Sequence, residues 1–224
     1  MTLATKICLI DNGVLQQYDA PLDVYNRPNS LFVADFVGNP AINFIEAAGK
    51  QRADGAIELS LLGGKSAVFH PKQPLDLAKW YADEDAKDAD KKTREAELAK
   101  NKKHVEKANK DTVFRCHIPM VTETEDFGDD AEPADGDFIV GVRPEFLKLS
   151  DTGALEGEIY SAMPTGMETT VRIRIGDYLL TGVVFGGVLY RIGEKVRMDF
   201  DGSGVVLFSR RNGRLISLGS VELG

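Results

Sequence analysis

Residues 6–46 read KICLIDNGVLQQYDAPLDVYNRPNSLFVADFVGNPAINFIE, and this stretch sets the order of the first structural elements. Asn12-Gly13 lies between two apolar runs, and this dipeptide favours a type I′ hairpin turn because both residues tolerate positive φ. Pro21 suits the first position of a short helix, where its missing N–H costs nothing. Apolar residues in helical spacing predict a second helix between Asn29 and Gly38. The stretch therefore predicts a hairpin followed by two short helices.

From Asn43 onward the chain contains many short runs of alternating apolar residues, which predict β-strands. Glycine-containing turns such as Gly63-Gly64, Gly176-Asp177 and Asn212-Gly213 separate some of these runs. We expect strands near residues 44–45, 57–61, 67–69, 138–142, 157–161, 171–175, 178–185 and 196–200. Many short strands joined by tight turns are typical of a small barrel or sandwich. The predicted fold class is therefore mainly β.

Residues 75–110 interrupt this pattern, because they contain no glycine or proline and are rich in Ala, Lys, Glu and Asp, a composition that favours helix. Carboxylates stand four positions before basic side chains, as in Asp83 with Lys87 and Asp88 with Lys92, and each pair adds about 0.2–0.5 kcal/mol. The apolar stripe is thin. We expect a solvent-exposed helix or helical hairpin inserted at about residues 75–111, then an acidic loop at about residues 123–137.

The composition excludes several classes of protein. The chain has 224 residues, 43% of them hydrophobic, and a formal net charge of -8, which opposes general attraction to nucleic acid or anionic lipid. No uncharged apolar segment reaches the roughly 20 residues that a membrane-spanning helix needs. The two cysteines, Cys8 and Cys116, are too few for a disulfide framework. A folded protein with no role in nucleic-acid binding is expected.

Three short stretches contain residue types that often carry chemistry, but each favours a plain structural interpretation. Gly64-Lys65-Ser66 matches the end of a phosphate-binding loop, but the position five residues earlier is Leu59 rather than glycine, and no long helix is predicted to follow. Cys116 and His117 are neighbours, so on a strand their side chains point to opposite faces and do not share a metal easily. The acidic stretch does not match an EF-hand loop. We predict no catalytic, cofactor-binding or metal-binding residue.

Residues 6–46 nevertheless resemble the end of the nucleotide-binding domain of an ABC importer ATPase of the maltose, multiple-sugar and glycerol-3-phosphate group, where it enters the C-terminal regulatory domain. The resemblance rests on several positions in order: Asn12-Gly13, Pro21, Tyr25, Arg27-Pro28, Phe32 to Phe36 and Asn43-Phe44. Two later stretches, residues 141–145 (GVRPE) and 165–169 (TGMET), resemble further signatures of that regulatory domain. The family-motif positions expected to have a structural or interface role are Gly141, Arg143, Pro144, Glu145, Gly166 and Glu168.

The resemblance implies two domains. Residues 1–38 would be a C-terminal remnant of the nucleotide-binding domain, and residues 39–224 would be an OB-like barrel of the transport-associated type, with the charged helical insertion and the acidic loop as departures from the family. The ATPase motifs would lie upstream of Met1, so ATP and Mg would belong to the missing part, and this chain would hold no cofactor.

The implied function is that of a non-catalytic regulatory and dimerisation domain of an ABC importer ATPase for sugar-type solutes. Its partners would be a second copy of the subunit, which binds through the C-terminal strands, and the membrane-spanning subunits, which bind through the missing domain. In some members a regulatory protein would also bind. It would be cytoplasmic, peripheral on the inner face of the cell membrane. An alternative is a sensor of a small oxyanion or sugar, with backbone N–H groups near Thr165-Gly166 or Gly186-Gly187 as the anion site. A nucleic-acid-binding OB domain is disfavoured because exposed aromatic residues on a basic groove are sparse.

Overall fold

The computed structural model describes residues 4–101, 114, 116–121, 133–202 and 204–224. Strands β1 (Ile7–Asp11) and β2 (Val14–Asp19) form an antiparallel hairpin whose turn residues Asn12 and Gly13 have φ of 47° and 77°. Helices α1 (Pro21–Asn26) and α2 (Leu31–Phe36) follow, and Ser30 Oγ caps α2 by accepting a hydrogen bond from Val33 N. The predicted hairpin and both short helices are confirmed. We call residues 4–38 the N-terminal segment.

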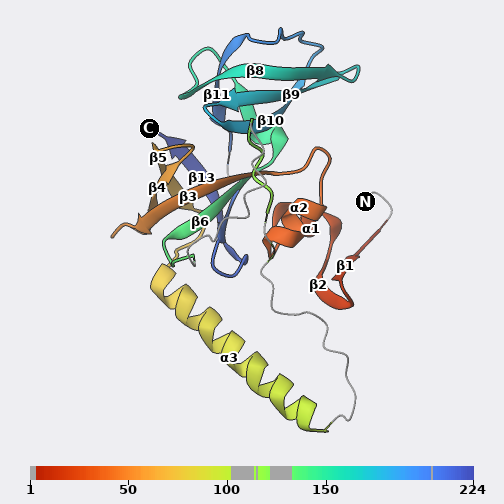
Figure 1. Ribbon diagram of the computed structural model, residues 1–224, viewed down its shortest axis with the longest axis vertical. Coiled ribbons are helices and arrows are strands. Elements are labelled where there is room, and N and C mark those ends of the chain that lie inside the picture. The colour runs from red at the N-terminus through yellow and green to blue at the C-terminus, as the bar shows by residue number, and fades with distance from the viewer. Residues whose placement is uncertain (1–3, 102–113, 115, 122–132, 203) are drawn as a thin grey trace.

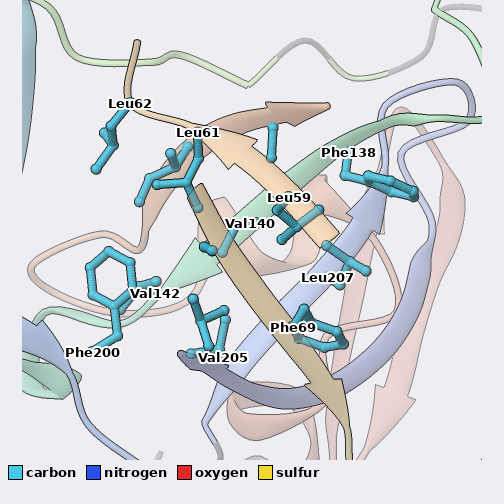
Figure 2. Close-up of a cluster of buried hydrophobic side chains, with 14 of the residues drawn as sticks. Leu59, Leu61, Leu62, Phe69, Phe138, Val140, Val142, Phe200, Val205 and Leu207 are labelled. Carbon is cyan, nitrogen blue, oxygen red and sulfur yellow. The ribbon is translucent and has the colours of Figure 1, made fainter. Parts of the chain in front are cut away.

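Six antiparallel strands close into a barrel in the order β12-β13-β5-β4-β3-β6. Their bounds are β3 (Asn43–Gln51), β4 (Ile57–Leu61), β5 (Lys65–Pro71), β6 (Asp137–Val142), β12 (Val205–Ser209) and β13 (Leu215–Leu223). Closure pairs every strand on both sides and removes exposed edges. Figure 2 shows inward-pointing side chains of this barrel, among them Leu59, Phe69, Val140 and Leu207, meeting in one buried cluster.

A second unit of five strands is inserted between β6 and β12, in the order β10-β9-β8-β11-β7. Its strands are β7 (Leu147–Leu149), β8 (Leu155–Pro164), β9 (Glu168–Ile175), β10 (Tyr178–Phe185) and β11 (Lys195–Phe200), and a short 3-10 helix, η1 (Pro144–Phe146), leads into it. Phe200 of β11 lies beside Val142 and Val205 of the barrel (Figure 2), so the two units share one core. Figure 1 shows the five-stranded sheet at the end of the molecule opposite the tip of α3.

Helix α3 (Leu77–Asn101) is the predicted insertion. Asp76 caps it, since Lys79 N donates to Asp76 Oδ1 at 3.0 Å, and the side chain of Gln51 holds its start by bonding to Leu75 O and Leu77 N at 2.7 and 2.9 Å. Leu77 and Tyr81 are buried against the barrel core, after which the helix projects away (Figure 1). The prediction of a solvent-exposed helix is therefore wrong for the first turns and correct for residues 89–93.

The mainly β class and the small OB-like barrel are confirmed. The sequence did not indicate β7, or that the strands divide between a barrel and a second sheet. Asp137 starts β6 and so is not part of a loop, while residues 102–111 of the expected helix and 123–132 of the acidic stretch lie outside the described residues. None of the described helices combines the length and the hydropathy that a bilayer crossing requires.

Candidate functional site

The clearest polar site is the junction between the N-terminal segment and the barrel, where Arg143 follows the last residue of β6. Its side chain is buried, with 2% of the residue exposed. Nη1 donates to the main-chain oxygens of Ala34 (3.3 Å) and Val37, and Nη2 donates to Tyr25 O at 3.0 Å. These oxygens lie at the ends of α2 and α1, where a helix carries partial negative charge. One guanidinium group therefore joins both helices to the barrel.

The surroundings of Arg143 fix its geometry. The guanidinium stacks on the Tyr25 ring, 4.1 Å from its centroid, and Nε is buried with no hydrogen-bond partner among the residues that the structure describes. Burial lowers the pKa of Arg143 from its ordinary value, while Tyr25 and Glu145 act in the opposite direction. The group stays charged at neutral pH because a guanidinium is not deprotonated in proteins. Gly38, at φ +124°, is needed because a Cβ there would lie 2.8 Å from Arg143 Nη1.

Glu145 and Pro144 complete this junction. Tyr25 Oη donates to Glu145 Oε1 at 2.7 Å, and burial together with this hydrogen bond raises the pKa of Tyr25 to about 12. Pro144 is buried and occupies the first position of η1, where it needs no N–H donor. Three of the predicted positions, Arg143, Pro144 and Glu145, are thus consecutive at the junction, and Gly141 lies two residues before Arg143. We call the contacts of Arg143 and Glu145 with the N-terminal segment the Arg143 latch.

Gly141 has a packing role in β6. It stands opposite Phe44 of β3 and Val206 of β12, and a Cβ on it would lie 2.9 Å from Ile42 Cδ1 and 3.2 Å from Phe208 Cε2. A side chain at this position would push apart the cluster that carries α2 on the outside of the barrel. Sequence reasoning named the position but not this reason.

Gly166 and Glu168 lie on a different part of the molecule, the turn between β8 and β9. Gly166 has φ +95° and open space around it, and Glu168 begins β9. The N–H of Thr165 donates to Glu168 O at 2.8 Å, and the N–H of Gly186 donates to Met167 O at 3.0 Å. Two of the backbone donors that the oxyanion alternative invoked are therefore already engaged.

A second polar cluster, which sequence reasoning missed, docks α3 on the turn between β12 and β13. Arg214 contacts the carboxylates of Glu84 and Asp88, and Arg211 contacts Asp85 and stacks over the Tyr81 ring at 5.1 Å. Glu84 is 7% exposed; burial by itself would raise its pKa, but hydrogen bonds from Lys87 and Arg214 outweigh burial and lower it. A turn signal at residues 212–213 was visible in the sequence, but its contact with α3 was not.

The same turn also contacts the link between α1 and α2. Leu31 N donates to Gly213 O at 2.8 Å, and Leu215 N donates to Asn29 O at 3.0 Å. The β12–β13 turn therefore touches both α3 and the N-terminal segment.

The Gly64-Lys65-Ser66 and Cys116-His117 stretches occupy ordinary structural positions. Gly64 lies in the turn between β4 and β5, Lys65 begins β5, and Ser66 pairs with Ser60 on β4, as the turn interpretation predicts. Cys116 is partly buried against the cluster that includes Phe44 and Phe208. Within the described residues, no three His, Cys, Asp or Glu side chains gather as a metal site would require.

Comparison with known proteins identifies homologues over about a third of the chain. It is 42% identical over 82 residues to the sn-glycerol-3-phosphate import ATP-binding protein UgpC of Escherichia coli, covering 34% of this chain and 23% of that protein. It is 47% identical over 73 residues to the alpha-glucoside transport ATP-binding protein AglK of Rhizobium meliloti, covering 31% and 19%. An uncharacterised ABC transporter ATP-binding protein of Escherichia coli, YcjV, is 38% identical over 77 residues, covering 34% and 21%. No family model matches the chain.

The names of these homologues describe ATP-binding proteins of transport systems, one for import of sn-glycerol-3-phosphate, one for alpha-glucoside transport and one of an ABC transporter, in line with the resemblance. The chain spans about a fifth of the length of the curated relatives it matches.

Proposed function

We propose that this chain is a non-catalytic regulatory domain of an ABC importer ATPase for sugar-type solutes. In this proposal residues 1–38 are the end of an ATP-binding domain, and residues 39–224 form the regulatory domain. The homologues support the importer context, and the resemblance of residues 6–46 supports the division near Gly38.

The Arg143 latch is the observation that carries the proposal. It connects the part of the chain that resembles an ATP-binding domain with the part that resembles a regulatory domain, and the guanidinium of Arg143 donates to main-chain oxygens at the ends of α1 and α2. Those hydrogen bonds fix α1 and α2 on the barrel, because a buried arginine that loses its hydrogen-bond acceptors raises the free energy of the folded state. A displacement of an attached ATP-binding domain would therefore move the barrel with it.

ATP and Mg have no assigned residues in this chain; the ATP-binding domain would hold them, and its ATP hydrolysis would drive import. The membrane-spanning subunits would meet that domain, a second copy of the subunit would complete the ATPase pair, and in some systems a regulatory protein would dock. The assembly would lie on the cytoplasmic face of the membrane. Gly166 and Glu168 stay predicted family-motif positions with a structural or interface role.

A chimera tests this function. The ATP-binding part of UgpC would be joined ahead of the N-terminal segment of this chain, and uptake of sn-glycerol-3-phosphate would be measured in cells that lack their own UgpC. We expect uptake with the unaltered sequence and at least a tenfold loss with Arg143→Ala. Arg174→Ala is the matched control, because Arg174 is exposed and pairs only across the sheet with Glu158 at 3.1 Å among the contacts described.

Two outcomes would contradict the proposal. The first is a chimera that binds ATP and folds but takes up solute equally well when Arg143 is replaced. The second is binding of ATP by this chain alone with a micromolar dissociation constant. Such affinity requires about 8 kcal/mol of binding free energy, which would mean that this chain itself contains an ATP site.

The oxyanion alternative receives less support. A surface pocket on the five-stranded sheet is lined by charged side chains that pair with each other, Arg174 with Glu158 at 3.1 Å and Lys195 with Glu156 at 4.0 Å. Isothermal titration with phosphate and with sulfate is expected to give no saturable heat of binding. A saturable heat would support the sensor function instead.

A further inference from the structure

The β12–β13 turn, residues 210–214, has two partners. Its side chains contact α3, because Arg214 reaches the carboxylates of Glu84 and Asp88. Its main chain contacts the link between α1 and α2, where Arg214 forms an antiparallel β-bridge with Ser30. The same arginine therefore touches the helical insertion through its side chain and the N-terminal segment through its backbone.

Hydrogen bonds within this turn make it one unit. Gly213 N donates to Ser209 O at 2.9 Å, and Ser209 N donates to Arg214 O at 3.0 Å. Arg214 N donates to the side-chain oxygen of Asn212 at 3.0 Å. Gly213 has φ +69°, a left-handed conformation that glycine adopts without strain. Because these bonds close the turn on itself, its side chains and its main chain move together.

Helix α3 is held differently at its start and further along. Its start is fixed by the buried residues Leu77 and Tyr81 and by the hydrogen bonds from Gln51. The next turns are held mainly by ion pairs, and two of the carboxylates in them are open to solvent, with 59% of the Asp85 side chain and 39% of the Asp88 side chain exposed. Exposed ion pairs are weak and are screened by salt. These turns of α3 can therefore leave the β12–β13 turn while the start of the helix stays docked.

The chain that follows the insertion also reaches the N-terminal segment. Phe114 packs edge-on against the ring of Phe32 in α2, with 5.7 Å between the ring centroids. Cys116 and Ile118 are partly buried against the cluster that contains Leu31 of α2. The two described ends of the insertion thus both contact the N-terminal segment, one directly and one through the β12–β13 turn.

We propose that the docking of α3 is coupled to the position of the N-terminal segment through the β12–β13 turn. While α3 is docked, Arg214 holds the turn where its main chain pairs with the α1–α2 link. When α3 is released, the turn loses one of its two partners and the link opens more often. The coupling is reciprocal, because each of two linked equilibria shifts the other.

This coupling gives the insertion a role that goes beyond the proposed function. Helix α3 has 25 residues, so it is about 37 Å long, and Figure 1 shows it projecting from the barrel. A binding event that favours the released position of α3 would therefore loosen α1 and α2. The coupling is a property of this chain by itself and does not depend on an attached ATPase.

Native-state amide hydrogen exchange of the whole chain tests the coupling. The amides to follow are those of Leu31 and Leu215, which donate between the link and the turn. The release variant is Glu84→Gln, Asp88→Asn, which neutralises both carboxylates that contact Arg214. We expect both amides to exchange at least tenfold faster than in wild type. Their rates should depend only weakly on urea below the unfolding transition, because opening of the link exposes little surface.

The matched control is Asp83→Asn, Asp90→Asn. Both side chains are exposed on α3, and neither reaches the turn among the contacts described, so this variant removes the same charge without releasing the helix. The exchange rates of the two amides should stay within about twofold of wild type. The amide of Val140, in the middle of β6 and fully buried, is the reference for global unfolding.

Salt releases the helix by a second route. At about 1 M sodium chloride the screening length is about 3 Å, which weakens exposed ion pairs. We therefore expect high salt to accelerate exchange of the Leu31 and Leu215 amides in wild type, and to accelerate it less in the release variant. Equal acceleration of both proteins would contradict the coupling.

Three further results would overturn the proposal. They are unchanged exchange in the release variant, equal acceleration in the control variant, and a urea dependence as steep as that of Val140, which would mean that the link opens only when the whole chain unfolds. Thermal unfolding checks that the release variant folds, and Asp85→Asn, Asp88→Asn replaces it, with the same expectations, if it does not. Uptake by the chimera does not enter these measurements, so failure of the proposed function and failure of the coupling give separate results.

Discussion

Asn43 and Thr181 are joined by two hydrogen bonds across the boundary between the barrel and the five-stranded sheet. Thr181 N donates to Asn43 Oδ1 at 2.7 Å, and Asn43 Nδ2 donates to Thr181 O at 2.8 Å. The same Nδ2 donates to Val142 O at 3.1 Å, and Asn43 is 4% exposed. The side-chain amide therefore pairs with β10 as a neighbouring strand would. This residue belongs to the Asn-Phe pair noted in the sequence, and it connects the two β units.

Replacing Asn43 by alanine should lower the free energy of unfolding by about 2–4 kcal/mol. The N–H and C=O of Thr181 would lose their partners close to a buried core, and each unsatisfied group costs about 1–3 kcal/mol. Urea denaturation at neutral pH measures the change. Asn26→Ala, at an exposed position of α1, is the control and should change stability by less than about 0.5 kcal/mol. Equal effects of the two substitutions would contradict this role of Asn43.

Glu84→Gln should destabilise the chain at pH 7 by about 1–3 kcal/mol, because it weakens charge-assisted hydrogen bonds from Arg214 and Lys87. The folded state lowers the pKa of Glu84, so its contribution is present above the unfolded pKa of about 4.3 and is lost as pH falls through the folded value. Wild type and variant should therefore converge in stability once pH falls below the lowered pKa of Glu84 in the folded state. Asp90→Asn, an exposed carboxylate further along α3, is the control for general charge loss. A difference that stays constant down to pH 3 would assign the effect to packing.

Local signals predicted most elements of the fold. Asn12-Gly13, Pro21 and the alternating apolar runs each act through φ preference or burial within a few residues, so the hairpin, both short helices and most strands were visible. The division into a barrel and a sheet was not visible, because β6 pairs with β3 and with β12, partners that are distant in the chain. A strand as short as β7 has no periodicity to detect.

The sites show the same limit. Arg143 was named from the sequence, but its acceptors are main-chain oxygens more than 100 positions away, which no side-chain pattern marks. Asp88 was expected to pair with Lys92 on the helix surface, whereas its carboxylate contacts Arg214 of the β12–β13 turn. Pairing between charges four residues apart describes an isolated helix. Because α3 docks on the barrel, Asp88 contacts Arg214 rather than Lys92.

The two cysteines should differ strongly in reactivity toward a thiol reagent. Cys8 is exposed, whereas burial raises the pKa of Cys116 to about 12, with nearby carboxylates of Glu46 and Asp35 acting in the same direction. Only the thiolate reacts, and at pH 8 a pKa near 12 leaves roughly one ten-thousandth of Cys116 in that form. We expect one fast thiol in the native chain, none in Cys8→Ser, and two fast thiols in urea. Fast labelling of native Cys8→Ser would contradict the partly buried position of Cys116 and its raised pKa.

The stability of the chain should decrease at alkaline pH because Tyr25 of the Arg143 latch loses its proton there. The folded state raises the pKa of Tyr25 to about 12, so it binds this proton more tightly than the unfolded chain, whose tyrosines titrate near 10. The stabilising contribution is therefore complete below about pH 10 and is lost as pH rises toward 12.

Tyr25→Phe removes both the titrating group and its hydrogen bond to Glu145, and should cost about 0.5–1.5 kcal/mol at pH 7. Because phenylalanine does not titrate, the stability of this variant should fall less steeply between pH 10 and 12 than that of the wild type. Tyr160→Phe, at an exposed position of β8, is the control and should follow the wild-type curve. Identical slopes for wild type and Tyr25→Phe would mean that the Tyr25 proton does not contribute to holding the N-terminal segment on the barrel.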